Sequence, residues 1–259
     1  MENRISERKV YFCGDIFYMN TSDWFTDWFN TTYYHILYKD RNDVDAQLFI
    51  RNIINFLNIP SSSHLLDLPC GKGRHSIYLN SLGYKVTGAD LSKNSIQAAK
   101  KYENSTLDFM LKDMRKPFDI KYDAVFNLFT SFGYFENDKD DILVLKNINN
   151  GLHKNGLLVL DFLNVINVEK KLVAKEIKIV DGITFNLQRE IKDGFILKHI
   201  TFTDKGVNYS FSERVKYLTL KKFESYFSEA GLKINHIFGD YHLSKFNTVT
   251  SERLIFVVS

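Results

Sequence analysis

The side chains best suited to bind a ligand lie in one stretch, where an apolar run ends at Asp67 and two glycines follow, Gly71 and Gly73. Glycines in a turn let the backbone approach a ligand closely, and the free amides at the start of the next helix attract an anionic group. A second carboxylate, Asp90, ends the next apolar run. A carboxylate at that position accepts hydrogen bonds from both hydroxyls of a ribose. The pattern therefore predicts a nucleotide-type cofactor at this turn.

Two classes of cofactor compete for this geometry. A nicotinamide-binding turn carries three glycines in the pattern Gly-x-Gly-x-x-Gly, whereas the third position here is Ser76. A dehydrogenase also has no evident need for Asp67 beside the turn. A carboxylate there can accept backbone amides and shape the loop with either cofactor, so Asp67 alone does not decide between them.

Five segments resemble, in the right order, the motifs of the class I S-adenosylmethionine-dependent methyltransferases. The resemblance covers residues 63–164 continuously and returns in the final helix and two strands. Several motifs in the right order make a chance match improbable. The segments are 67–73 for the first motif, 83–92 for the second, 112–115 after the third strand, 127–134 after the fourth, and 155–161 for the turn and fifth strand.

The resemblance implies which residues contact the cofactor, S-adenosylmethionine, whose product is S-adenosylhomocysteine. Asp113 is expected to contact the adenine amino group, and residues 127–134 are expected to line the methionine part. Pro69 stands where many family members carry a glycine, which is a mild departure from the first motif. The expected cofactor contacts within the motifs are Asp67, Pro69, Cys70, Gly71, Gly73, Asp90, Leu91, Asp113, Met114, Asn127, Leu128 and Phe129.

Tyrosines crowd the segment before the first core helix, and similar segments in the family cover the cofactor. Tyr34 or Tyr38 is expected to contact the cofactor carboxylate, and Arg41 is expected to pair with it. His35 is the candidate general base because histidine titrates near neutral pH, and Tyr34 is the second catalytic candidate. The alternative is that these rings only pack the N-terminal cap. Methyl transfer requires no strong base, because the cofactor supplies the reactive electrophile.

Helical and strand patterns alternate from residue 46 onward. Apolar residues spaced at i, i+3, i+4 and i+7 predict an amphipathic helix over 46–57. The alternation predicts an α/β fold with a doubly wound, mostly parallel seven-stranded sheet and a small antiparallel β insert. The resemblance implies that this sheet is of the Rossmann-like methyltransferase type. The first five predicted strands are 64–68, 85–89, 107–111, 124–128 and 156–162, and the last two are 233–238 and 253–258.

The antiparallel insert is predicted from turn residues between alternating runs. Asp193-Gly194 and Lys205-Gly206 separate runs that alternate apolar and polar residues, a pattern typical of β-hairpins. The insert is either a lid or a dimer surface. The chain is thus expected to divide into an aromatic and helical cap at 1–45, a cofactor-binding core at 46–164, the β insert at 165–217, and a helix and two strands at 218–259 that complete the core.

Composition, net charge and cysteine count indicate what class of protein this is and which partners are not expected. The chain has 259 residues, 44% hydrophobic and 25% charged, which is an ordinary globular balance. A net charge of +3 gives no reason to expect a nucleic-acid or membrane partner. Cys13 and Cys70 cannot build a disulfide framework or a zinc cluster, so no metal is expected. The N-terminal residues contain no apolar secretion segment, and we expect a cytoplasmic location.

These observations predict an enzyme that transfers a methyl group from S-adenosylmethionine to a nitrogen or oxygen atom of an unidentified small molecule, by in-line displacement. A small acceptor is favoured because the insert is large enough to roof a closed pocket. Two alternatives stay open: a nicotinamide-dependent oxidoreductase, and a non-catalytic S-adenosylmethionine-binding protein that uses the insert as a partner surface. If the insert is a dimer surface, the protein is a homodimer.

Overall fold

The computed structural model describes residues 8–12, 15–19, 24–39 and 43–259. The chain divides into two compact units. The first unit combines residues 1–40 with 172–216, and the second combines 41–171 with 217–259. No described helix is both long and apolar enough to span a lipid bilayer.

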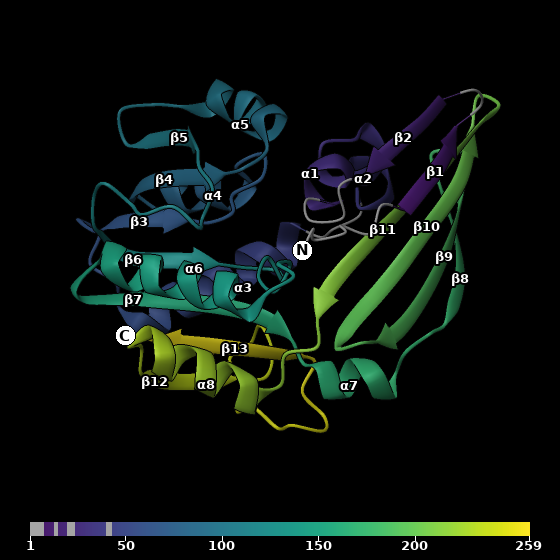
Figure 1. Ribbon diagram of the computed structural model, residues 1–259. Coiled ribbons are helices and arrows are strands. Elements are labelled where there is room, and N and C mark those ends of the chain that lie inside the picture. The colour runs from purple at the N-terminus through teal and green to yellow at the C-terminus, as the bar shows by residue number, and fades with distance from the viewer. Residues whose placement is uncertain (1–7, 13–14, 20–23, 40–42) are drawn as a thin grey trace, which may run out of the picture. The chain divides into compact units, whose positions relative to one another are not determined.

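The second unit is built on one seven-stranded sheet (Figure 1). Its strands are β3 (His64–Asp67), β4 (Lys85–Asp90), β5 (Leu107–Leu111), β6 (Tyr122–Asn127), β7 (Leu152–Leu163), β12 (Ile234–Phe238) and β13 (Arg253–Val258). They follow the order β12-β13-β7-β6-β3-β4-β5 across the sheet. Neighbouring strands from β7 to β5 are parallel, whereas β13 is antiparallel to both of its neighbours. The predicted mostly parallel, seven-stranded α/β sheet is therefore confirmed.

Three helices cover one face of this sheet: α3 (Asp43–Leu57), α4 (Arg74–Ser81) and α5 (Lys93–Ala99), the last continued by the 3-10 turn Lys100–Tyr102. The apolar stripe of α3 is buried, as its spacing predicts, because Phe49 and its neighbours one turn apart all point at the strands.

Two further helices cover the opposite face. They are α6 (Asp138–Gly151) and α8 (Leu220–Ala230), which contact each other. Phe223 of α8 packs on Phe162 of β7 and Phe256 of β13, with ring centroids 5.1 and 4.9 Å apart. The sheet is thus the middle of three layers, and ligands in such folds bind beyond the carboxyl ends of the strands. A short helix, α7 (Val165–Lys170), follows β7.

The first unit contains an antiparallel sheet of four strands in the order β11-β10-β9-β8. The strands are β8 (Lys175–Val180), β9 (Ile183–Lys192), β10 (Phe195–Asp204) and β11 (Val207–Lys216). In the turn between β9 and β10, Asp193 and Gly194 have φ values of 52° and 77°. Two consecutive positive φ values are typical of tight hairpin turns. The predicted antiparallel insert is therefore confirmed, although the sequence pattern missed the edge strand β8.

Two N-terminal helices of the first unit pack on this same sheet. Helix α1 (Trp24–Phe29) and helix α2 (Thr32–Leu37) follow a hairpin of β1 (Arg8–Phe12) and β2 (Asp15–Met19), which the sequence pattern did not predict. The Trp28 ring lies 4.6 Å from that of Phe211 on β11. The aromatic rings predicted to form a cap are thus part of the apolar core beneath the four strands.

Candidate functional site

The glycine turn lies where the sequence places it, between the end of β3 and the start of α4. A cis peptide bond joins Leu68 to Pro69, and Gly71 and Gly73 have φ values of 55° and 85°. A Cβ atom on Gly73 would lie 2.6 Å from the Phe109 ring, so no side chain fits there. A Cβ atom on Gly71 would meet nothing within 4 Å. The turn therefore leaves open space beside Gly71, which a ligand can fill.

Asp90, at the end of β4, is tied to this turn by its carboxylate. The backbone amide of Gly71 donates to Oδ2 of Asp90 over 2.8 Å, and the amide of Ser92 donates to Oδ1 over 2.7 Å. Burial raises the pKa of Asp90, although these amides oppose the shift. Each carboxylate oxygen retains a second lone pair that can accept a ribose hydroxyl. Leu91, the next predicted contact, is 39% exposed beside it.

Asp67 is the most unusual group at the site. Its side chain is 1% exposed, and the Ser76 hydroxyl donates to Oδ2 over 2.6 Å. No described residue forms a hydrogen bond with Oδ1. Burial raises the pKa of this carboxyl to about 7. A buried carboxylate oxygen without a partner costs free energy, and a polar or cationic ligand would remove that cost.

Ser76 supports Asp67, a role that sequence reasoning missed. From the sequence alone, Ser76 draws attention only because it stands where a nicotinamide-binding turn carries its third glycine. Its hydroxyl fits because the facing strand residue is Gly88, where a Cβ atom would lie 2.8 Å from Ser76 Oγ. A glycine on the next strand was the only sequence signal of this contact.

Cys70 shapes the turn and is not a reactive thiol. Its backbone amide donates to the carbonyl of Ala89 over 2.9 Å, which joins the turn to β4. Its side chain is buried, and burial raises the thiol pKa well above the ordinary value. A thiol that stays protonated is a poor nucleophile.

Asp113 follows β5 and is held by Arg115. The guanidinium donates from Nη2 to Asp113 Oδ2 over 2.7 Å and from Nε to Oδ1 over 3.0 Å. Although burial favours the neutral acid, the hydrogen bonds and charge of Arg115 lower the pKa of Asp113. Met114, the adjacent predicted contact, accepts a hydrogen bond at its carbonyl from the Asn147 amide over 3.3 Å. Arg115 was not predicted as a partner of Asp113.

The end of β6 brings a second set of predicted contacts beside Asp67, because β3 and β6 are parallel neighbours with Asp67 opposite Phe126. Asn127 is fully buried, and neither the nitrogen nor the oxygen of its side-chain amide has a hydrogen-bond partner among the described residues. Leu128 is also buried. The orphaned amide and the free oxygen of Asp67 are polar groups that fit a polar cofactor at these two strand ends.

Phe129 connects the end of β6 with the start of α4. Its ring stacks on His75, with centroids 4.8 Å apart and planes 17° apart. Burial and the Arg74 charge lower the pKa of His75 to about 3, so the ring is neutral at physiological pH. His75 packs on the Phe129 ring at the start of α4.

A buried ion pair contacts the residues that follow β6, and the sequence did not predict it. Asp161 on β7 is 0% exposed and accepts from Nε of Arg253 on β13 over 2.8 Å. The same carboxylate accepts from the Phe129 backbone amide over 2.8 Å and from the Tyr241 hydroxyl over 3.3 Å. Burial raises the pKa of Asp161, against the pull of the Arg253 charge. Asp161 ends one of the resembling motifs, but 92 positions separate it from Arg253.

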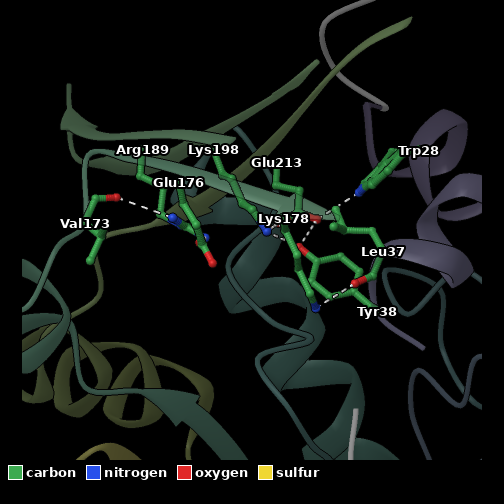
Figure 2. Close-up of polar contacts among 9 residues, drawn as sticks. All are labelled: Trp28, Leu37, Tyr38, Val173, Glu176, Lys178, Arg189, Lys198 and Glu213. Atoms are coloured by element: carbon green, nitrogen blue, oxygen red, sulfur yellow. Dashed lines mark hydrogen bonds and ion pairs between the residues drawn. The ribbon is translucent and has the colours of Figure 1, made fainter. Parts of the chain in front are cut away.

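The candidates Tyr34, His35 and Tyr38 belong to the first unit, and Figure 2 shows the contacts of Tyr38. The Tyr38 hydroxyl donates to Glu213 Oε1 over 2.6 Å, and the Trp28 indole donates to the same oxygen over 2.8 Å. Lys198 lies 3.7 Å from Glu213 and above the Tyr38 ring. Tyr38 therefore helps to fix α2 on the sheet, and its predicted contact with the cofactor stays a prediction.

Tyr34 and His35 are neighbours on α2, with ring centroids 5.2 Å apart. Both side chains are half-buried, and Tyr34 also packs against Trp28. Their predicted catalytic roles stay predictions. Arg41, predicted to pair with the cofactor carboxylate, lies outside the described residues. Within the described part of the chain, no three His, Cys, Asp or Glu side chains form a group that would hold a metal ion.

Comparison with known proteins points to one family. Residues 65–156 match the family model described as a methyltransferase domain. A putative methyltransferase of Bacillus subtilis, YqeM, is 34% identical over 108 residues, which are 40% of this chain and 44% of the relative. The chain thus matches less than half of that relative's length. A Streptomyces venezuelae relative is 24% identical over 190 residues, covering 70% of this chain and 79% of the relative. Its name is dTDP-3-amino-3,4,6-trideoxy-alpha-D-glucopyranose N,N-dimethyltransferase.

A solved structure shares the fold of the chain. It is an S-adenosylmethionine-dependent methyltransferase from Clostridium acetobutylicum, with a TM-score of 0.74 at 19% identity. The alignment covers 88% of this chain and 95% of that one. Residues 65–156 are thus similar to a methyltransferase domain, and the chain as a whole shares the fold of an S-adenosylmethionine-dependent methyltransferase.

Proposed function

We propose that this chain is an S-adenosylmethionine-dependent methyltransferase acting on a nitrogen or oxygen atom of a small molecule. The observation that carries the proposal is the junction of Asp67 and Asp90 at the glycine turn. There Asp67 Oδ1 has no partner among the described residues, and Gly71 borders open space. A polar, cationic cofactor satisfies both conditions.

Three aspartates of the second unit have binding roles in this proposal. Asp90 accepts the ribose hydroxyls, Asp113 accepts from the adenine amino group, and Asp67 offers its free oxygen to the positively charged part of the cofactor. When bound, S-adenosylmethionine supplies an electrophilic methyl group on its sulfonium. The chain then needs only to orient an acceptor lone pair in line with the carbon–sulfur bond and to keep water away. Orientation of this kind accounts for about 7–11 kcal/mol of a barrier at its best.

We propose an amine as the first acceptor class to test. The supporting observation is the Streptomyces venezuelae relative, which aligns with most of this chain and whose name states N,N-dimethylation of an amino sugar. The net charge of +3 on 259 residues gives no electrostatic reason to expect a nucleic-acid acceptor. The two cysteines in the whole sequence fit a reducing compartment, so we propose the cytoplasm as its location.

We propose further that Tyr34, His35, Tyr38 and Arg41 act on the methionine end of the cofactor and on the acceptor. The support is their residue types: a histidine side chain can act as a general base, and a guanidinium such as that of Arg41 pairs with carboxylates. Tyr38 already lies in a charged network with Lys198 and Glu213, which fixes its ring.

We also propose that the insert forms a homodimer contact through β8. This strand is an edge of the four-stranded sheet, and Ile177 and Ile179 on it are 69% and 71% exposed. An exposed apolar edge strand is a template for pairing with another chain. A lid over the acceptor is the competing role for the insert.

Product formation tests the proposed activity directly. The protein is incubated with S-adenosylmethionine and a panel of small amines and alcohols, including nucleotide-linked amino sugars, and S-adenosylhomocysteine is measured. The expected result is acceptor-dependent product with at least one amine. Asp90→Ala is the matched variant, which should lose this product. Cofactor binding without turnover across the panel would favour a non-catalytic binding protein.

A further inference from the structure

The turn after β6 has an unusual backbone. Phe129 and Thr130 are consecutive non-glycine residues with φ values of 57° and 60°. Residues with side chains rarely adopt this left-handed conformation, and they keep it only where surrounding contacts enforce it. Strained residues of this kind cluster at functional sites. The contacts that enforce the conformation are therefore of interest.

Two residues far away in the sequence hold this turn. The Asp161 carboxylate accepts the Phe129 amide over 2.8 Å, and the Asp161 carbonyl accepts the Thr130 amide over 3.0 Å. From β13, Arg253 donates through Nη2 to the Thr130 hydroxyl over 3.0 Å. Both strained residues are thus bound by the same pair.

Two nitrogen atoms of Arg253 contact the same carboxylate oxygen of Asp161. Arg253 approaches Asp161 Oδ1 with Nε and Nη2 at 2.8 and 2.7 Å. Asp161 is fully buried, and the Arg253 side chain is 18% exposed. Tyr241 completes the arrangement: its hydroxyl donates to Asp161 and its ring lies 5.3 Å from that of Phe129. A buried ion pair seldom adds net stability, so its retention favours a specific structural role.

The turn borders the proposed cofactor site on two sides. It follows β6, whose Phe126 carbonyl accepts the amide of Leu68 just before the glycine turn. The Phe129 ring stacks on His75, in the first turn of α4 beyond Gly73. A movement of Phe129 would therefore shift the residues that face the ligand.

We infer that Asp161 and Arg253 are positioning residues: with Tyr241, they fix the Phe129–Thr130 turn in the shape that the cofactor site requires. The inference rests on the proposed function, because it assigns the turn to that site. Neither residue contacts the reacting atoms in this account. Their effect passes through the backbone of the turn.

The first test measures the turn itself, without any cofactor. Amide hydrogen exchange is followed by NMR in the wild type and in Asp161→Asn. The single carboxamide oxygen of asparagine cannot replace both carboxylate oxygens, which accept separately from Arg253 and from the Phe129 N–H. The Phe129 amide is expected to exchange at least tenfold faster in the variant, while core amides of β3 and β6 keep their protection. An unchanged rate at Phe129 would overturn the inference.

The second test measures affinity for S-adenosylhomocysteine by titration calorimetry. Asp161→Asn is expected to weaken binding about tenfold. Arg253→Lys keeps the charge but cannot bind Asp161 and Thr130 together, so a smaller loss is expected. Tyr241→Phe keeps the ring and removes only a 3.3 Å hydrogen bond, so it should bind almost as the wild type does. This graded series remains informative if Asp161→Asn does not fold.

Thr87→Val is the control for general destabilisation. Thr87 is buried in the same sheet, and its hydroxyl contacts His64 and Asp108 at the amino ends of their strands. This variant should lower the melting temperature and leave both Phe129 exchange and affinity unchanged. Equal loss of affinity in Thr87→Val would overturn the inference. If the wild type bound no S-adenosylhomocysteine, the proposed function would fail, and the exchange experiment would still decide whether the pair holds the turn.

Discussion

Asp67 combines two properties that are unfavourable together when no ligand is bound. Its side chain is buried, and one of its carboxylate oxygens has no hydrogen-bond partner among the described residues. Its pKa of about 7 lies well above the value of about 4 for an unfolded aspartate. The folded state therefore binds a proton more tightly than the unfolded state does. Stability from this proton is fully present below pH 4 and is lost as the pH rises through 7.

Replacing Asp67 with asparagine should remove this pH dependence. Above pH 7 the Asp67→Asn variant is expected to be more stable than the wild type, by up to about 4 kcal/mol, because three pKa units correspond to that free energy. Near pH 4 the two proteins should have equal stability. Urea unfolding at several pH values measures the difference. A wild type that is more stable than the variant at pH 8 would contradict this prediction.

The same substitution separates stability from binding. Asparagine carries no charge, so Asp67→Asn should bind S-adenosylmethionine more weakly than the wild type at pH 8 despite its greater stability. Proteins that bury an unfavourable polar group at a binding site commonly lose stability in exchange for binding in this way.

At the scale of elements, the two glycines of the turn have different roles. Gly73 is enclosed by Phe109 and Ala99, whereas Gly71 borders open space. Gly73→Ala should lower the free energy of unfolding by roughly 1–3 kcal/mol through strain and overpacking. Gly71→Ala should cost roughly 1 kcal/mol of stability, since only its backbone is strained.

Gly73→Ala should lose more stability than Gly71→Ala, whereas Gly71→Ala should lose more affinity for the cofactor. A methyl group on Gly71 projects into the space that the cofactor needs, so Gly71→Ala is expected to lose more affinity than its loss of stability suggests. Calorimetry and thermal unfolding of both variants give the comparison. Similar affinities in Gly71→Ala and the wild type would place the cofactor elsewhere.

Elements with a clear period could be predicted from the sequence. The apolar stripe of α3 and the hairpin turns at Asp193 and Lys205 followed directly from residue spacing. Strand β8 did not, because Ile177 and Ile179 are exposed on an edge and Val180 is the only buried residue of the strand. Its pattern is that of a solvated surface, and pairing with β9 makes it a strand.

The arrangement of residues at the glycine turn could be predicted because it follows from the order of the strands. Asp67, Gly71 and Asp90 follow consecutive strands, and a parallel sheet brings such strand ends together. The supporting contacts of Ser76 and Arg253 could not be predicted, because they depend on how distant elements pack. Residue type alone does not reveal which carboxylate an arginine will meet.

At the scale of the molecule, the chain is divided between two units with separate cores. The first unit joins segments far apart in sequence: Trp28 and Glu213, which are hydrogen-bonded, are separated by 185 positions. The N-terminal aromatic segment and the insert therefore form one body. A role proposed for Tyr38 thus depends on residues of the insert as well.

The proposed dimer can be tested on the edge strand of this unit. Ile177→Lys and Ile179→Lys together should convert a homodimer into a monomer, because charged side chains on an edge oppose strand pairing. Light scattering coupled to size-exclusion chromatography gives the mass. Thr184→Lys on the neighbouring strand β9 is a control, as its side chain is exposed but not on the edge strand. A wild-type monomer would contradict the dimer and favour a lid.

The central claim is that the junction of Asp67, Gly71 and Asp90 binds S-adenosylmethionine. Titration calorimetry of the wild type with S-adenosylmethionine, S-adenosylhomocysteine and NADH tests it most directly, with Asp90→Ala as the paired variant. We expect micromolar binding of the first two ligands, no binding of NADH, and a loss of roughly 1–3 kcal/mol of binding free energy in Asp90→Ala. Binding of NADH alone, or unchanged affinity in Asp90→Ala, would contradict it.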